Sequence, residues 1–349
     1  MSVRDVGLAQ TAEHDLQDRL KLAVSRYWSS PGRDQPSASD GEIQLRPVKG
    51  WDALVATLPE HGDRPAAFVK VFREAASFER EQRGLAAGQA VVMGEGSDDG
   101  VEVRVPALLS QVDAARALVM QRIEGPVLGT RIRRDYFVLR DRCVPALSAL
   151  GRWLARLHTQ DGPTTQYGEI LDRELSFIGS TLELVQPRIG ATRARQAGRL
   201  LALLGQDLAA HPRPLKWCHG DFQPGNVIVA GRTLYVVDFA YSGAGWPEQD
   251  LVLLKHNLRT GVSDLPFGSH ACRLLWSAFL AGYRQVCPDP YDGQVWDLFE
   301  LRYQSFGVRW RSYLYQDSAR QKVLSLYRYA LGVRRFRAWL DTRARTYGL

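Results

Sequence analysis

Apolar residues recur at helical spacing near the start of the chain, at Leu16, Leu20, Leu22, Ala23 and Tyr27. This period predicts an amphipathic helix from about Leu16 to Trp28. The following segment, 29–41, is rich in Ser, Pro, Gly and Asp and has no periodicity, which is typical of a linker. We therefore expect residues 1–41 to form an N-terminal helix and a linker.

Short runs with the composition of β strands follow, at 42–48, 52–58 and 66–72, separated by turn-forming residues. A segment of helical composition begins at Phe78, and the strand pattern then resumes as far as Ile123. This succession predicts an antiparallel sheet with one helix.

Beyond residue 124 the pattern is mainly helical, with one interruption at 217–243. There, the runs NVIV and TLYVVDF flank the turn AGR, which predicts a β-hairpin. We expect an α+β protein of two lobes, a small antiparallel-sheet lobe at 42–123 and a larger, mainly helical lobe at 124–349 that includes the hairpin.

The composition changes this picture little. The chain has 349 residues, of which 45% are hydrophobic and 24% charged, as expected of a soluble folded protein. Its first residues contain no apolar run of signal-peptide length, and no apolar stretch approaches the ~18 residues of a transmembrane helix, so we expect a cytoplasmic protein. The four cysteines are widely spaced and lack the pattern of a zinc site, so we expect reduced structural thiols.

Positive charge is concentrated in the last third of the chain. From Leu251 onward there are 15 Lys or Arg and 7 Asp or Glu, whereas the whole chain carries a net charge of +7. Such a surplus fits a solvated helix face, an anionic substrate or a membrane surface. The sequence has no basic helix-turn-helix, zinc-finger or aromatic ribonucleoprotein motif, so we expect no nucleic-acid partner.

The predicted hairpin carries the candidate chemistry. In CHGDFQPGNVIV, Asp221 and Asn226 stand five positions apart in a loop that Pro224 and Gly225 keep from being helical, and Asp238 ends the second β run. Oxygen ligands at adjacent loop ends can hold a hard cation, which leaves Asp221 to accept a proton. An aligned hydroxyl and a divalent metal are two requirements of phosphoryl transfer.

The spacing HGDxxxxN, followed by VVDF with its Asp238 twelve positions after Asn226, resembles the aminoglycoside phosphotransferase and choline kinase family, whose fold is similar to that of protein kinases. The resemblance implies that Asp221 orients the substrate hydroxyl and takes its proton, while Asn226 and Asp238 bind Mg²⁺. His219 of the same motif would support the loop backbone. EQDL at Asp250 and the helix that ends with His158 extend the resemblance over roughly 66–254.

Lys70 lies within the apolar run FVKVF, where an ammonium group is costly unless it meets an anion. The resemblance implies that it contacts the α- and β-phosphates of the nucleotide. Its partner should be a Glu of the following helix, where Glu79 and Glu81 point to different sides. The family pattern favours Glu81.

ALVMQRIEG resembles the family's hinge, expected at 120–125. Met120 would then sit behind the adenine, while the carbonyl of Gln121 and the N–H of Ile123 would pair with its edge. The chain departs from protein kinases in the phosphate-covering loop, where RPVKGWD offers a single glycine in place of GxGxxG.

These residues predict an ATP- or GTP-dependent small-molecule kinase. The acceptor would be a hydroxyl of an antibiotic, sugar, nucleoside or related metabolite, and the basic surplus favours a neutral or anionic one. Resistance to an antibiotic and ordinary metabolism both fit. The alternatives are a nucleotide-binding pseudokinase and a protein kinase; the short spacing between Asp238 and Asp250 argues against the latter.

Overall fold

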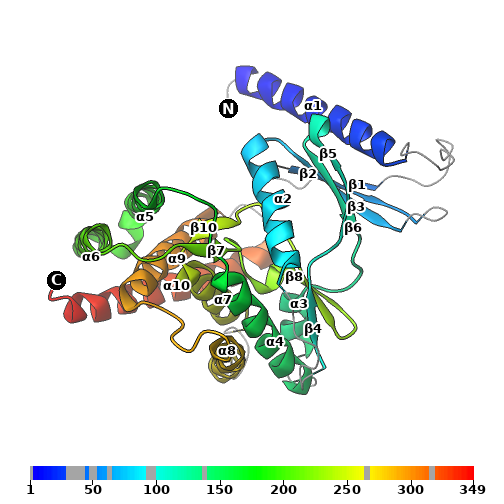
Figure 1. Ribbon diagram of the computed structural model, residues 1–349. Coiled ribbons are helices and arrows are strands. Elements are labelled where there is room, and N and C mark those ends of the chain that lie inside the picture. Colours follow the sequence, from blue (N-terminus) through cyan, green and yellow to red (C-terminus); the bar gives the residue numbers. More distant parts are fainter. Residues whose placement is uncertain are drawn as a thin grey trace. The chain divides into compact units, whose positions relative to one another are not determined.

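The computed structural model describes residues 3–28, 44–46, 53–60, 65–91, 100–135, 140–262, 268–313 and 319–349. They form two compact units (Figure 1). The sheet unit comprises Met1–Thr130 and Gly225–Ser242, and the helical unit comprises Arg131–Pro224 and Gly243–Leu349. No helix in the described part of the chain is both long enough and apolar enough to cross a membrane.

A five-stranded antiparallel sheet organises the sheet unit, as predicted. The strands are β1 (Gln44–Arg46), β2 (Ala53–Leu58), β3 (Ala67–Phe72), β5 (Leu108–Val112) and β6 (Ala117–Gln121). Their order is β1-β2-β3-β6-β5, so β3 and β6 lie inside the sheet. Buried and partly exposed residues alternate along β2, because successive side chains of a strand point to opposite faces.

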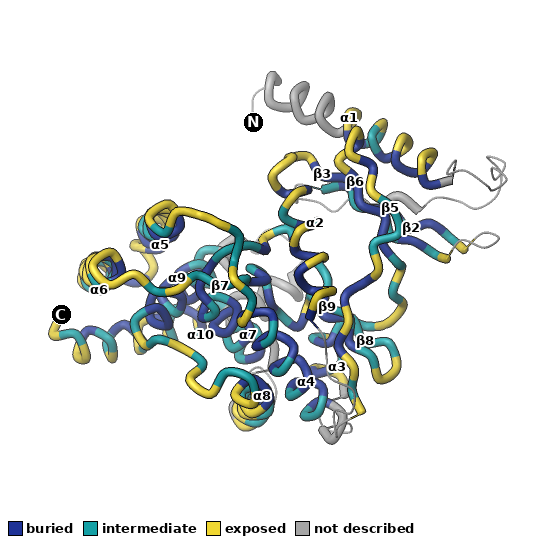
Figure 2. Tube along the Cα trace, viewed as in Figure 1, coloured by how far each residue is buried: buried dark blue, intermediate teal, exposed yellow. Residues whose placement is uncertain are grey.

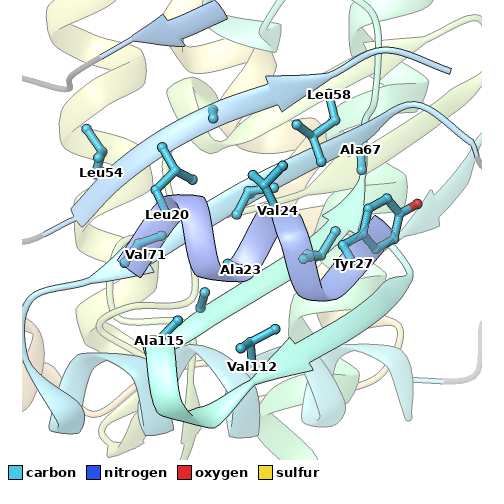
Figure 3. Packing of buried hydrophobic residues seen from close by; sticks show 14 of the residues in the cluster. Leu20, Ala23, Val24, Tyr27, Leu54, Leu58, Ala67, Val71, Val112 and Ala115 are labelled. Carbon is cyan, nitrogen blue, oxygen red and sulfur yellow. The ribbon is translucent and has the colours of Figure 1, made fainter. Parts of the chain in front are cut away.

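Helix α1 (Val3–Trp28) covers one face of this sheet (Figure 3). Leu20 and Val24 of the helix pack in one apolar cluster with Ala67, Val69 and Val71 of β3. The predicted helix is therefore present, and it begins earlier than Leu16. It is also part of the sheet unit's core, because its apolar stripe is buried against the strands.

The predicted hairpin consists of β8 (Val227–Ala230) and β9 (Thr233–Val236). Strand β9 also pairs, in parallel, with β4 (Glu102–Arg104), giving a small sheet of order β4-β9-β8. This pairing joins the hairpin to the sheet unit. The grouping differs from the expected division, in which the hairpin belongs to 124–349, because the pattern of one short run does not reveal a strand partner about 130 positions away.

In the part of the chain that the structure describes, eight helices supply most of the helical unit: α3 (Leu128–Asp135), which begins in the sheet unit, α4 (Arg140–Thr159), α5 (Tyr167–Ile189), α6 (Ala191–Ala210), α7 (Pro247–Val262), α8 (Gly268–Arg284), α9 (Gly293–Tyr313) and α10 (Ala319–Thr346). Helices α5 and α6 bury one side and expose the other (Figure 2). Strands β7 (Lys216–Cys218) and β10 (Gly243–Gly245) form a two-stranded antiparallel ribbon.

Helices α4 and α8 approach each other at their backbones. A Cβ atom on Gly151 would lie 2.1 Å from the carbonyl oxygen of Phe279, and one on Gly282 would lie 2.0 Å from that of Ser148. Only glycine fits at these two positions. The stacked rings of Trp153 and Phe222 then connect α4 to the loop that follows β7, with ring centroids 6.2 Å apart.

Candidate active site

Lys70 is the centre of a buried ion-pair cluster in the sheet unit. Its Nζ lies 2.8 Å from Oε2 of Glu81 and 2.7 Å from Oδ1 of Asp238. The side chains of Lys70 and Glu81 are 12% and 1% exposed, whereas that of Asp238 is 35% exposed. Burial alone would lower the pKa of Lys70, but the charges and hydrogen bonds of the two carboxylates raise it overall. The lysine is therefore held as a cation.

Helix α2 (Ala75–Gln89) presents Glu81, not Glu79, to the lysine. Glu79 is two positions earlier and exposed, because residues two apart on a helix face different directions. Burial raises the pKa of Glu81, and Lys70 opposes that rise.

Helix α2 is also fixed to the segment that follows Asp238. Arg80 Nε donates to the carbonyl of Ala240 at 2.9 Å, and Ser242 Oγ donates to the carbonyl of Arg80 at 2.9 Å. A Cβ on Gly84 would lie 2.7 Å from Cβ of Phe239, so the glycine permits this close packing. These contacts hold Asp238 beside the helix that carries Glu81.

Asp238 adopts a left-handed backbone conformation, with φ of 69°. This region is uncommon for residues other than glycine, and it marks a site where the surroundings fix the backbone. The preceding residue, Val237, donates its N–H to the carbonyl of Asn226 at 3.0 Å. Asn226 and Asp238 therefore project from neighbouring ends of the two hairpin strands.

Met120 and Lys70 belong to the same face of the sheet. In the register of β3 and β6, Phe68 pairs with Met120 and Lys70 pairs with Leu118, and paired residues point to the same side. This is the face opposite α1. Gln121 ends β6, and its N–H donates to the carbonyl of Ala107 at 2.8 Å.

Ile123 follows in the short segment that leads out of the sheet. This segment then packs against the hairpin. Val229 donates its N–H to the carbonyl of Pro126 at 3.0 Å, and a Cβ on Gly125 would lie 2.2 Å from the Val229 carbonyl oxygen. The segment expected to be the hinge is thus tied to β8. The predicted phosphate-covering loop lies outside the described residues beyond Arg46.

Asp221 belongs to the helical unit, in a loop that Asp250 organises. Asp250 is fully buried at the start of α7 and accepts the N–H of His219 at 2.7 Å and that of Gly220 at 2.8 Å. His158 Nε2 lies 3.1 Å from the same carboxylate, and its Nδ1 lies 2.8 Å from the hydroxyl of Tyr283. A buried carboxylate with several donors is a strong constraint on the loop backbone.

The carboxylate of Asp221 is partly exposed and is held by a neighbour in the loop. Gln223 Nε2 lies 3.0 Å from each of its two oxygens. Asp221 donates its own N–H to Nδ1 of His219 at 3.3 Å. His219 is completely buried, so its ring supports the loop backbone and is remote from solvent.

The sequence did not predict a role at the site for three residues that hold Asp221 or the loop around it. Gln223 occupies one of the four unspecified positions of HGDxxxxN. The only feature of the sequence that could have indicated its role is that it lies two residues after Asp221. His158 ends a helix that the sequence identified, but its pairing with Asp250 spans 92 positions. Tyr283 lies in an aromatic helical stripe that resembles ordinary core.

The expected site residues are thus divided between the units. Lys70, Glu81 and Asp238 are in direct contact, and Asn226 joins them through the backbone next to Asp238. Asp221 lies in the helical unit, and the boundary falls between Pro224 and Gly225 within the same loop.

Solved structures of several kinases share this fold. The chain is similar to amicoumacin kinase hAmiN in complex with AMP-PNP and Ca²⁺, with 15% identity, 96% of each chain covered and a TM-score of 0.57. It is similar to choline kinase from Cryptosporidium parvum, with 12% identity, coverage of 94% of this chain and 96% of that one, and a TM-score of 0.55. It is also similar to a thermostable mutant of aminoglycoside phosphotransferase APH(4)-Ia, with 14% identity, coverage of 87% of this chain and 95% of that one, and a TM-score of 0.53.

These likenesses show a kinase-like fold, as the sequence predicted. The chain belongs to the phosphotransferase enzyme family, which matches residues 46–288. No curated protein shows significant sequence similarity to it. The predictions of the family and of a phosphotransferase are therefore confirmed.

Proposed function

We propose that the protein transfers the γ-phosphoryl group of ATP or GTP to a hydroxyl group of a small molecule. The observation that carries this proposal is the ion-pair cluster of Lys70 with Glu81 and Asp238. In the sequence, the motif HGDFQPGN directly precedes the hairpin that ends at Asp238. A buried cation held by carboxylates on an inner strand of the sheet suits the non-transferred phosphates of a nucleotide. The family match supports the same reaction.

The nucleotide would bind on the face of the sheet that carries Lys70. Lys70 would exchange part of its contact with Asp238 for the α- and β-phosphates, while Glu81 keeps its ammonium group in place. Met120 would lie behind the base, since it occupies the same face. The carbonyl of Gln121 and the N–H of Ile123 would pair with the base edge.

Asn226 and Asp238 would hold Mg²⁺. Their amide and carboxylate oxygens are the ligands that this hard cation prefers, and the partial exposure of Asp238 leaves it accessible. The metal would neutralise charge on the phosphates when bound. The left-handed backbone at Asp238 fixes the direction of its carboxylate.

Asp221 would orient the acceptor hydroxyl and take its proton. The acceptor oxygen forms a bond to the γ-phosphorus, the bond from that phosphorus to the bridging oxygen of the nucleotide breaks, and the hydroxyl proton passes to the Asp221 carboxylate. The hydrogen bonds of Gln223 hold this carboxylate in one orientation. Asp250 would hold the loop backbone in place through the N–H groups of His219 and Gly220.

The acceptor would be a neutral or anionic antibiotic, sugar, nucleoside or related metabolite. From Leu251 onward the chain has 15 basic and 7 acidic residues, which disfavours a polycation. The similar structures include kinases named for amicoumacin and for choline, and an aminoglycoside phosphotransferase, so the fold alone accommodates acceptors of different kinds.

The test is a mass-spectrometric screen of hydroxylated compounds with Mg²⁺ and either ATP or GTP. We expect a product heavier by one phosphoryl group and dependent on the metal. Asp221→Asn is the control for contaminating kinases, because it should lose the product. Nucleotide binding without product across a broad library, and identical for Asp221→Asn, would favour the pseudokinase.

A further inference from the structure

A groove in the helical unit gathers arginine side chains from two helices. It has a volume of about 510 Å³, and Arg259 of α7 lines it together with Arg334, Arg335, Trp339 and Arg343 of α10. Thr342 also lines it. We call this the arginine groove.

The groove is rich in positive charge because α10 is. Between Ala319 and Thr346 the helix carries eight Lys or Arg and a single acidic residue, Asp341. Asp341 pairs with Arg193 of α6, whose Nε and Nη2 lie 2.9 and 2.8 Å from its two oxygens. Among the described residues that line the groove, none is acidic. The one acidic residue of α10 therefore neutralises a cation elsewhere.

The thiol of Cys272 on α8 also lies near several of these positive charges. Burial raises the pKa of Cys272, and four cations oppose that rise: Arg259, Lys255, Arg335 and Arg273. These cations come from α7, α8 and α10, so the three helices bring them near one point. Arg343, which also lines a neighbouring pocket, lies 2.9 Å from Oδ1 of Asp297.

Like charges in a recess repel one another, so this arrangement favours a ligand that supplies negative charge. Guanidinium groups bind phosphate through paired hydrogen bonds, and several of them in one groove match a ligand with more than one anionic oxygen. Trp339 adds an aromatic wall. A volume of about 510 Å³ is that of a small-molecule site.

We propose that the arginine groove binds a small phosphate-bearing polyanion, at a site separate from the one formed around Asp221. Arg259 lies nine positions after Asp250 along α7. At 1.5 Å per residue this is roughly 14 Å of helix. The groove thus offers the protein a third ligand, in addition to the nucleotide and the acceptor.

The test uses pyrophosphate and inorganic phosphate as probes, with hydrogen–deuterium exchange of the full chain at constant ionic strength. We expect saturable protection of peptides from the second half of α7 and from residues 329–345. Protection near Lys70 would be scored separately, so binding at the nucleotide site is distinguished. Arg259→Gln and Arg334→Gln lie on different helices, and each should weaken binding at the groove about tenfold.

Arg345→Gln is the matched control, because Arg345 lies on the same helix, is exposed and does not line the groove. It removes the same charge and should leave the affinity within about twofold. Three results would overturn the proposal: no protection of α7 and α10 by either probe, equal weakening by all three substitutions, or binding of a DNA duplex by this face without binding of pyrophosphate.

Discussion

Lys70 Nζ lies 2.7 Å from the carboxylate of Asp238, although 168 positions separate the two residues. The sequence predicts one in a strand and the other at the end of a hairpin, and the structure brings them into direct contact. Glu81 completes the cluster from that helix. The three groups are interdependent, because the ammonium group of Lys70 compensates two carboxylates that repel each other.

Replacing Glu81 with Gln should damage both activity and stability. Lys70 would lose one of two carboxylates in a buried setting, and we expect about a hundredfold lower kcat/KM and a loss of about 2 kcal/mol in the free energy of unfolding. Steady-state kinetics and urea unfolding measure the two effects. Glu79→Gln is the matched control on the same helix and should change neither. Equal effects of the two substitutions would contradict the assignment of Glu81.

Substitutions of two aspartates should separate catalysis from nucleotide binding. Asp221→Asn should lower kcat by about a thousandfold and leave nucleotide affinity nearly unchanged, because the amide cannot accept the proton. Asp238→Ala should instead weaken metal-dependent nucleotide binding, measurable by calorimetry with and without Mg²⁺. If Asp221→Asn retained full turnover on the true acceptor, the base would have to be another group.

Much of this arrangement follows from local sequence. The strand around Lys70, the helix carrying Glu81 and the hairpin between Asn226 and Asp238 each have a pattern of period or turn residues that predicts them. The choice between Glu79 and Glu81 required the family pattern. Helical spacing shows that the two side chains face different directions, but it does not show which of them faces Lys70.

The remaining features depend on contacts between distant positions. Pairing of β9 with β4, and the hydrogen bonds of Asp250 with His158, connect segments whose local patterns are ordinary. Nothing in the sequence around Gln223 distinguishes a residue that holds Asp221 from a solvated loop amide. Such interactions arise from tertiary packing, which periodicity does not record.

Packing of α1 on the sheet gives a test of the sheet unit's stability. Leu20 is 2% exposed in the shared core, whereas Leu22 on the same helix is 37% exposed. Leu20→Ala should reduce the free energy of unfolding by about 3 kcal/mol because it leaves a cavity. Leu22→Ala deletes the same atoms and should cost less than about 1 kcal/mol. Urea unfolding of both variants measures the difference, and similar losses would show that α1 does not pack as described.

Glu248 should make the helical unit less stable as the pH rises. It is buried at the start of α7 and accepts the N–H of Asp292 at 2.6 Å, and burial raises its pKa to about 7 from an ordinary value of 4.5. Between these two values the folded protein holds a proton that the unfolded chain has lost, so the free energy of unfolding falls with increasing pH. The full effect is about 3 kcal/mol as an upper bound.

Glu248→Gln keeps an oxygen for the Asp292 N–H but cannot ionise. It should therefore flatten the dependence of stability on pH between about 4.5 and 7 and make the protein more stable than the wild type at pH 8. Urea unfolding at several pH values provides the measurement, with the exposed Glu183→Gln as the matched control that leaves the wild-type curve unchanged. If the dependence of stability on pH were the same for Glu248→Gln as for the wild type, Glu248 would ionise in the folded protein at its ordinary pKa. A nearby cation would then compensate its charge, such as Arg213, which lies 3.0 Å from Asp292.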